Sequence, residues 1–534
     1  MKFIYSKYLY TLLFFSVILI SSCNEEEFLQ EDPRDRLTSE NLYTTPEGFQ
    51  NGLNALYALV RTERDVTSGR LPGMMWWTSN DDIYSPVNNT PDLPYIEWGE
   101  FNNSTVGLYS DVWNWLYRTI NAANTIISRA DNESIEWESS DQKNNVLAQA
   151  RLIRSWAYRH LINLWGDVPL VTSESTGSNI RTDWERTSVA QIMELMEEDW
   201  LFAEEHLPEL HTTPGRLNRA VAQHYLAELY LMMDDPEMAE QKARAVIDNP
   251  NFELITERYG VEANEPGVPF MDQFIDGNVF YNQGNTEALW VFPNERNVVG
   301  GSDNNHMRRT WLLWYWRNPG INLTPERGRG IGWLGFTKYG VELYEPADDR
   351  GSEYAIHRYF IKDNGDTLWT TTDPAEFEGV GPAGLEPNRP NNWPGTRKWD
   401  DGNIEILNDA AGYKDQPYLR LAETYLLLAE ALFMQGENEE AAEVINVLRS
   451  RANASEVTAE DIDIDFILDE RSRELFAEEH RRYVLLRHDK WLERTRLHNN
   501  QSGQFITERD KYFPIPQSVI DANLDSEFPQ NPGY

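Results

Sequence analysis

The stretch NVLAQARLIRSWAYRHLINLWGDVPL, residues 145–170, decides the fold class of this 534-residue chain. Its bulky side chains recur at helical spacing and form one broad face: Leu152, Trp156, His160 and Leu164 four residues apart, with Ile153, Ala157 and Leu161 beside them. Such a face predicts a helix that packs against other helices. Gly166 and Pro169 predict the end of this helix, because glycine favours the residue after a helix and proline cannot continue one.

Three further segments show the same helical pattern, at residues 186–210, 216–248 and 417–452. Thr187 or Ser188 is expected to cap the first of them. The other two each predict a pair of helices joined by a short turn, with Pro236 at a helix start and Gly436 in a turn. Helix pairs of about 34 residues are typical of tetratricopeptide units. We therefore expect a mostly α fold of degenerate tetratricopeptide-like pairs, which are not contiguous in the sequence.

Residues 251–416 differ from this pattern, because they are rich in Gly, Pro, Asn and Trp. Within them, Asn364 and Gly365 predict the turn of a β-hairpin. So long an irregular insertion of loops and short strands is usually where function lies. The expected organisation is a signal peptide at 1–22, an N-terminal helical region at 23–250, an irregular ligand-binding insertion at 251–416, and a C-terminal helical pair with its closing segment at 417–534.

The charge balance excludes several classes of partner. Asp and Glu number 87 against 47 Lys and Arg, so the formal net charge is −40. That field repels nucleic acid and anionic lipid headgroups. One cysteine permits no internal disulfide, and no Cys/His cluster indicates zinc. The acidic run at 461–465 lacks the glycine and terminal glutamate of an EF-hand loop. We expect no cofactor. A structural calcium ion is possible, but the sequence assigns no residues to it.

The first thirty residues resemble the signal of a bacterial lipoprotein. Lys2 and Lys7 precede an apolar run at 9–20, which is too short for a membrane span, and Ser21 and Ser22 precede Cys23. Cleavage before Cys23 would leave its thiol to carry lipid and anchor the chain. An ordinary cleavable signal with an incidental cysteine is the alternative. The acidic run at 24–27 is either a solvated linker or, by resemblance, the export signal of surface lipoproteins in the Bacteroidota.

Several segments together resemble the SusD/RagB family of nutrient-binding outer-membrane lipoproteins. They are the opening FLQEDPRDRLTSENLYTTPEGFQ, the segment RLIRSWAYRHLINLWGDVPLV, the helix ILDERSRELFAEEHRRYVLLR and the C-terminal YFPIPQSVIDANLDSEFPQNPGY. Val484, Leu485 and Glu479 depart from the family pattern within a scaffold helix, where Glu474 and Arg473 are expected to make ordinary surface pairs. The resemblance implies a glycan-binding subunit that sits on a SusC-like TonB-dependent transporter and passes oligosaccharides to it. It implies no enzyme, and no G-x-S-x-G, H-E-x-x-H or P-loop pattern occurs.

Candidate sugar-binding residues follow from chemistry, since aromatic rings stack on the apolar faces of sugars and polar side chains bond their hydroxyls. The segment MRRTWLLWYWRNPG, residues 307–320, is the densest candidate, with Trp311, Trp314 and Trp316 among arginines. If this segment is helical, Trp311 and Trp314 share a face. Trp333 in a glycine-rich loop is a second candidate. Residues 74–103 contribute the remaining ones: Tyr84, Asn88 and Trp98. For any single tryptophan, core packing is the alternative.

Two functions remain open at this point. The first is glycan capture at the outer membrane by a lipid-anchored, surface-exposed protein that delivers its ligand to a SusC-like transporter. The second is a tetratricopeptide-type protein-interaction scaffold of an outer-membrane complex, without direct glycan binding. The acidic balance favours a neutral glycan, although a local basic groove could still exist.

Overall fold

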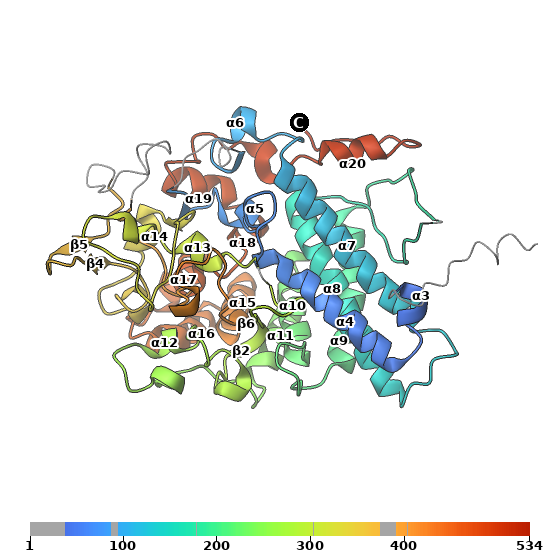
Figure 1. Ribbon diagram of the computed structural model, residues 1–534, viewed down its shortest axis with the longest axis horizontal. Helices are drawn as coiled ribbons and strands as arrows, with labels where there is room; N and C mark the ends of the chain where they lie inside the picture. Colours follow the sequence, from blue (N-terminus) through green and yellow to red (C-terminus); the bar gives the residue numbers. More distant parts are fainter. Residues whose placement is uncertain (1–37, 87–93, 178, 303, 374–390, 403) are drawn as a thin grey trace, which may run out of the picture.

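Antiparallel helices form the scaffold of the molecule (Figure 1), and the computed structural model describes residues 38–86, 94–177, 179–302, 304–373, 391–402 and 404–534. The mostly α prediction is confirmed. The long helices are α4 (Pro46–Arg61), α7 (Gly107–Arg129), α8 (Ser140–Trp165), α9 (Val189–His206), α10 (Arg219–Met232), α11 (Pro236–Ile247), α15 (Leu421–Gln435) and α16 (Asn438–Arg451). The shorter ones are α3 (Ser39–Leu42), α5 (Met74–Trp77), α6 (Trp98–Phe101), α12 (Pro269–Asp272), α13 (Met307–Trp311), α14 (Lys338–Glu342), α17 (Ile464–Leu475), α18 (Arg481–Arg487), α19 (Trp491–His498) and α20 (Gln517–Ala522).

Local signals fix the ends of the scaffold helices. Ser139 caps α8 by accepting from the backbone N–H of Gln142, and α8 ends at Gly166, whose φ is 73°. Ser188, rather than Thr187, caps α9 by accepting from the N–H of Gln191. Gly436, with φ 81°, terminates α15 in the left-handed conformation that glycine adopts without strain. The predicted ends of these helices are therefore confirmed.

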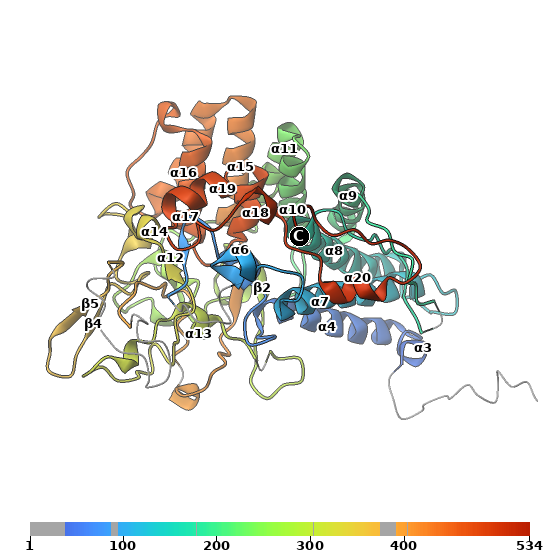
Figure 2. The ribbon, with the colours of Figure 1, turned by 90° about the horizontal axis from the view of Figure 1, so that it is seen from above.

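The helix pairs are contiguous in space although they are not contiguous in sequence. Each helix packs against the next in the order α7, α8, α9, α10, α11, α15, α16, while α4 packs on α7 and α8. Figure 2 shows α11, α15 and α16 side by side. The whole insertion therefore leaves the array after α11 and returns to it at α15. No helix in the described ranges is long and apolar enough to cross a bilayer.

Three two-stranded antiparallel sheets order the insertion and fasten it to the scaffold. They pair β1 (Ile83–Tyr84) with β3 (Gly335–Phe336), β2 (Ala288–Phe292) with β6 (Gln416–Arg420), and β4 (Tyr359–Ile361) with β5 (Thr367–Trp369). The β4–β5 hairpin turns at Asn364 and Gly365 as predicted, with Gly365 at φ 86°. Since β6 leads directly into α15, the β2–β6 pair holds the insertion against the first helix of the C-terminal pair.

Buried ion pairs around α17 replace the surface pairs expected there. Glu474 is fully buried, and three arginines contact it: Arg350 (3.2 Å), Arg420 (3.1 Å) and Arg451 (2.5 Å). Glu470, also buried, contacts Arg350 at 2.7 Å and Arg449 at 2.8 Å. The expectation of surface pairing was wrong because the long arginine side chains of neighbouring segments reach inward to α17. These contacts join the insertion, β6 and α16 to one helix.

Burial alone would raise the pKa of Glu474, but the charges of Arg451, Arg420 and Arg350 outweigh it and hold the pKa below its usual range. Glu474→Gln is therefore expected to lower the free energy of unfolding by about 3 kcal/mol or more near neutral pH, since it leaves buried arginines without a charge partner. Urea denaturation followed by circular dichroism measures this. The exposed Glu493, paired with Lys490, supplies the control Glu493→Gln, expected to change stability by less than about 1 kcal/mol.

The pH dependence of stability tests whether the effect of Glu474→Gln is ionic. A carboxylate whose folded-state pKa is lowered contributes stability above its ordinary pKa of 4.5 and loses it as the pH falls below that value. The gap in stability between the wild type and Glu474→Gln should therefore narrow as the pH is lowered from 6 toward 3. A gap that stays constant over this range would contradict an ionic origin.

Candidate functional site

Two segments of the insertion lie side by side and bring three of the predicted tryptophans together. The backbone carbonyl of Arg309 accepts from the N–H groups of Ile331 and Gly332, each at 3.1 Å. Gly330 and Gly332 permit this approach: an added Cβ would lie 2.1 Å from the carbonyl oxygen of Leu312 and 2.8 Å from the Cα of Leu313, respectively. Glycines are therefore needed in the loop around Trp333, because the backbone of residues 312–313 passes too close for a larger side chain.

Tryptophan rings and arginines alternate along this junction. We name it the tryptophan–arginine patch, made of Arg70, Arg309, Trp314, Trp316, Arg317, Arg329 and Trp333. The guanidinium carbons lie over the rings at these distances from the centroids: Arg70 over Trp333, 4.8 Å; Arg309 over Trp333, 5.5 Å; Arg329 over Trp316, 5.5 Å; Arg317 over Trp316, 4.4 Å; and Arg317 over Trp314, 5.1 Å. Cation–π attraction holds such pairs.

The patch is only partly accessible. Trp316 is half-buried and its Nε1 donates to the carbonyl of Gly330 at 3.2 Å, while Arg317 beside it is exposed. Trp314 and Trp333 each expose 6% of their surface. Arg309 and Arg329 are half-buried. What reaches solvent is therefore the surface of Trp316 together with guanidinium groups, rather than a broad flat platform of bare rings.

The electrostatics of the patch oppose those of the chain as a whole. Burial lowers the pKa of Arg309, and the positive charges of Arg329 and Arg70 lower it further. Arg309, Arg317 and Arg329 form no salt bridge with any carboxylate of the described residues. A positive region thus exists within a strongly acidic protein.

Two of the predicted site residues are fully buried, and Trp333 of the patch also belongs to the main hydrophobic core. Trp311 is fully buried at the end of α13, 5.3 Å from the Trp77 ring and 5.5 Å from that of Phe476. The expected shared helical face is wrong, because α13 ends at Trp311, before Trp314. Trp98 is fully buried too, and packs at 5.1 Å on Phe513 with its Nε1 donating to Ser79. Neither ring can serve as an exposed stacking surface.

The remaining predicted residues have separate positions. Tyr84, on β1 opposite Gly335, is half-buried and stacks on Trp393 at 4.3 Å and 14°. Gly335 makes room for that stack, since an added Cβ would lie 2.6 Å from the Trp393 ring. Asn88 and Cys23 lie outside the described residues. The arginines of the patch, in contrast, were not predicted as site residues, although Arg317 and Arg329 lie next to or near tryptophans in the sequence.

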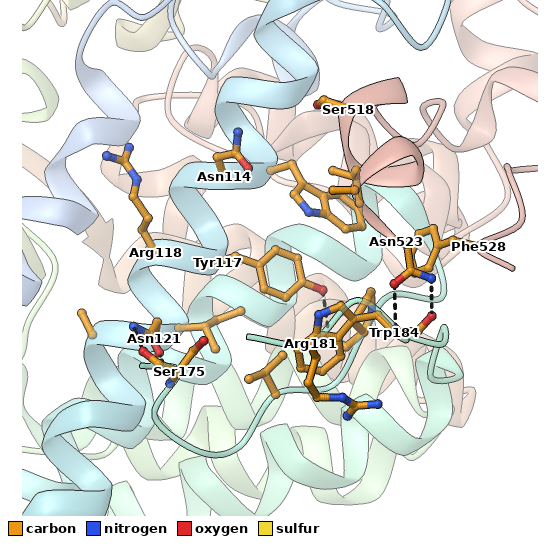
Figure 3. Close-up of a pocket in the computed structure, with 17 residues that line it drawn as sticks. Asn114, Tyr117, Arg118, Asn121, Ser175, Arg181, Trp184, Ser518, Asn523 and Phe528 are labelled. Atoms are coloured by element: carbon orange, nitrogen blue, oxygen red, sulfur yellow. Dashed lines mark hydrogen bonds between the residues drawn. The ribbon is translucent and has the colours of Figure 1, made fainter. Parts of the chain in front are cut away.

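Away from the patch, a cavity of about 830 Å³ lies between α7, the segment after α8 and α20 (Figure 3). Trp113, Tyr117, Trp184 and Phe528 give it largely apolar walls. Some of its polar groups bond within the protein: Asn523 bonds both backbone groups of Trp184, and the Tyr117 hydroxyl donates to the carbonyl of Pro169. Because its walls are largely apolar, the cavity suits an apolar surface better than a hydroxyl-rich sugar.

One cluster of possible metal ligands occurs among the described residues, formed by Glu63, His160 and His480, whose ligand atoms lie within 4.8 Å of one another. Burial holds the pKa of both histidines well below the usual value, so they are neutral. The Tyr418 hydroxyl already donates to Glu63 at 2.7 Å. In the acidic run predicted not to bind calcium, Asp463 caps α17 and Asp465 pairs with Lys490. We interpret both groups as structural.

The chain resembles known proteins along most of its length. A family model described as "SusD family" matches residues 341–534, and one described as "Starch-binding associating with outer membrane" matches residues 54–231. The SusD-like protein P2 of Formosa agariphila is 24% identical over 97% of this chain and 99% of its own. The SusD-like protein P25 of the same organism is 25% identical over 53% of this chain and 52% of its own.

Solved structures share the fold. A SusD homolog from Bacteroides thetaiotaomicron has a TM-score of 0.73 at 20% identity, covering 93% of this chain and 98% of that one. A laminarin-binding SusD-like protein has a TM-score of 0.70 at 19% identity, covering 91% and 99%. Surface glycan-binding protein A from Bacteroides thetaiotaomicron, in complex with laminarihexaose, has a TM-score of 0.70 at 18% identity, covering 91% and 100%.

Trp311→Ala is expected to act on stability rather than on ligand binding. Removing a fully buried indole should lower the free energy of unfolding by about 3–5 kcal/mol through lost burial and the cavity left behind. Chemical denaturation measures the loss. Trp369→Ala, which removes a ring that is 65% exposed on β5, is the control and should change stability by less than about 1 kcal/mol. Equal effects of the two substitutions would contradict the core position of Trp311.

Proposed function

Because the chain belongs to the SusD/RagB family, we propose that it is a cell-surface glycan-binding lipoprotein that captures oligosaccharides or polysaccharides at the tryptophan–arginine patch. It then delivers them to a SusC-like TonB-dependent transporter. The observation that carries the proposal is the partly exposed ring of Trp316, which lies beside Trp314 at the junction that also holds Trp333, among side chains that donate hydrogen bonds. Structural relatives whose names include laminarin or a complex with laminarihexaose support a sugar ligand.

The proposed location is the outer membrane, with lipid on Cys23 and the protein facing the medium. The lipoprotein-like sequence around Cys23 supports this anchor, and so does the description of the matching family model, which names association with the outer membrane. The proposed role is binding without catalysis. Carboxylates of the described scaffold such as Glu470 and Glu474 support this, since arginines engage them in the core.

A protein-interaction scaffold is the second candidate function. The apolar cavity between α7 and α20 favours it, because its walls would accept an apolar segment of a partner (Figure 3). Glycan capture and partner docking use different parts of the chain and are separable by experiment. Stable capture of the transporter without retardation by any glycan in affinity electrophoresis would favour the scaffold alone.

Trp316→Ala is expected to weaken glycan binding about fivefold or more without unfolding the protein, because a lost stacking contact costs on the order of 1 kcal/mol. Affinity electrophoresis against a polysaccharide panel, followed by isothermal titration with the best ligand, measures the change. Trp369→Ala is the matched control, since its ring is exposed on a different hairpin. Weaker binding by Trp369→Ala with unchanged binding by Trp316→Ala would move the site from the patch to the β4–β5 hairpin.

Cys23→Ala is expected to release the protein from the membrane fraction, because the lipid that holds it there would have no attachment point. Fractionation of cells that express the full chain, followed by immunoblotting, measures the distribution. Cys23→Ala retained in the membrane fraction would contradict the anchor.

A further inference from the structure

We propose that the tryptophan–arginine patch selects an anionic glycan, one that carries carboxylate or sulfate groups. This inference rests on the proposed glycan-binding function and names the chemical class of its ligand. It reverses the expectation of a neutral glycan, which followed from the net charge of the whole chain.

The arginines of the patch lack carboxylate partners. Many buried arginines have them: Arg350 contacts Asp348, Glu470 and Glu474, and Arg471 contacts Glu423, Glu430 and Glu479, while Arg482 donates to backbone carbonyls instead. Arg309, Arg317 and Arg329 have none among the described residues, although the chain contains 87 acidic residues. Arg309 and Arg329 are half-buried and their charges repel each other, which costs free energy unless an anion completes the site.

These three arginines also have unused hydrogen-bonding capacity. The side chains of Arg309 and Arg317 donate to no described residue, and Arg329 donates once, to the carbonyl of Asn408 at 3.1 Å. The Nε atoms of Arg309 and Arg329 are buried without a hydrogen-bond partner in the described chain. The three arginine side chains therefore offer several hydrogen-bond donors and no hydrogen-bond acceptor.

Two of these arginines stack on the ring of Trp316. The Arg317 and Arg329 guanidinium groups lie over the Trp316 ring at 4.4 and 5.5 Å, so cations already cover part of the surface on which a sugar face would stack. A guanidinium carries its N–H donors in its own plane, so stacking leaves that edge free for a carboxylate or sulfate. The rings thus position the arginines in addition to contacting sugar.

The test uses glycans that share a backbone and differ in charge. The full mature protein is titrated with polygalacturonate and with its fully methyl-esterified form, and with a sulfated carrageenan and its desulfated form. We expect at least one anionic form to bind about tenfold or more tightly than its neutral counterpart. Raising the NaCl concentration from 50 to 500 mM should weaken that binding and leave any neutral binding unchanged. The two pairs distinguish carboxylate from sulfate.

Substitutions of the arginines test whether the preference for the anionic glycan arises at the patch. Arg317→Gln and Arg329→Gln should each reduce the preference for the anionic form about tenfold, and Arg317→Lys should restore it only in part, because lysine keeps the charge and loses the planar fork. Since Arg317 is exposed, Arg317→Gln is expected to fold. Arg244→Gln, on α11, removes an arginine that is paired with Glu240 and Glu440, and is expected to bind like the wild type.

The outcomes separate the two proposals. Equal binding of charged and neutral forms would overturn the anionic preference and leave the glycan-binding function in place. An anionic preference unchanged in both Arg317→Gln and Arg329→Gln would overturn the assignment to the patch. Absence of binding to every glycan in a wider panel of neutral and charged polysaccharides would overturn the proposed function, and this inference with it.

Discussion

The buried carboxylates of α17 are the constraint on which the rest of the structure depends. Glu470 and Glu474 lie in the core, where an isolated charge would be prohibitive, and arginines from the insertion, from β6 and from α16 neutralise them. Because a buried charge must meet its partner at short range, each pair fixes one segment relative to α17. The position of the irregular insertion on the helical array therefore depends on charge pairing as well as on apolar packing.

Much of the fold could be predicted from local patterns. Helical periodicity, Gly166, Ser188 and Gly436 act within a few residues of where they lie, so their effects are visible in the sequence. The burial of Glu474 was not visible, because charged residues normally indicate a solvated surface. Its partners Arg350 and Arg420 are distant in sequence, and the packing of α17 against α15 and against residues 349–351 brings these segments together.

The candidate site, like the fold, could be predicted only where local sequence patterns determine it. Composition singled out a segment that contains the partly accessible Trp316, although Trp314 in the same segment and the nearby Trp333 are buried. Composition could not tell the accessible ring from buried ones such as Trp311 or Trp98, because burial depends on which backbone passes alongside. At the patch, the two loops of the insertion are in contact because Gly330 and Gly332 allow their backbones to approach closely. The net charge averages over the chain, whereas a ligand meets the local field, so the net charge alone does not decide the charge of the ligand.

The direct packing of α11 against α15 makes the insertion a closed loop whose two ends are held by the scaffold. The entropic cost of closing a loop rises slowly with its length, by about 0.6 kcal/mol for each doubling. Residues can therefore be added to the exposed loops of this segment at little entropic cost, provided that core residues such as Trp311 and anchors such as Arg350 and β2 remain. The architecture separates the part that must stay constant to fold from the part that can vary to meet a new ligand.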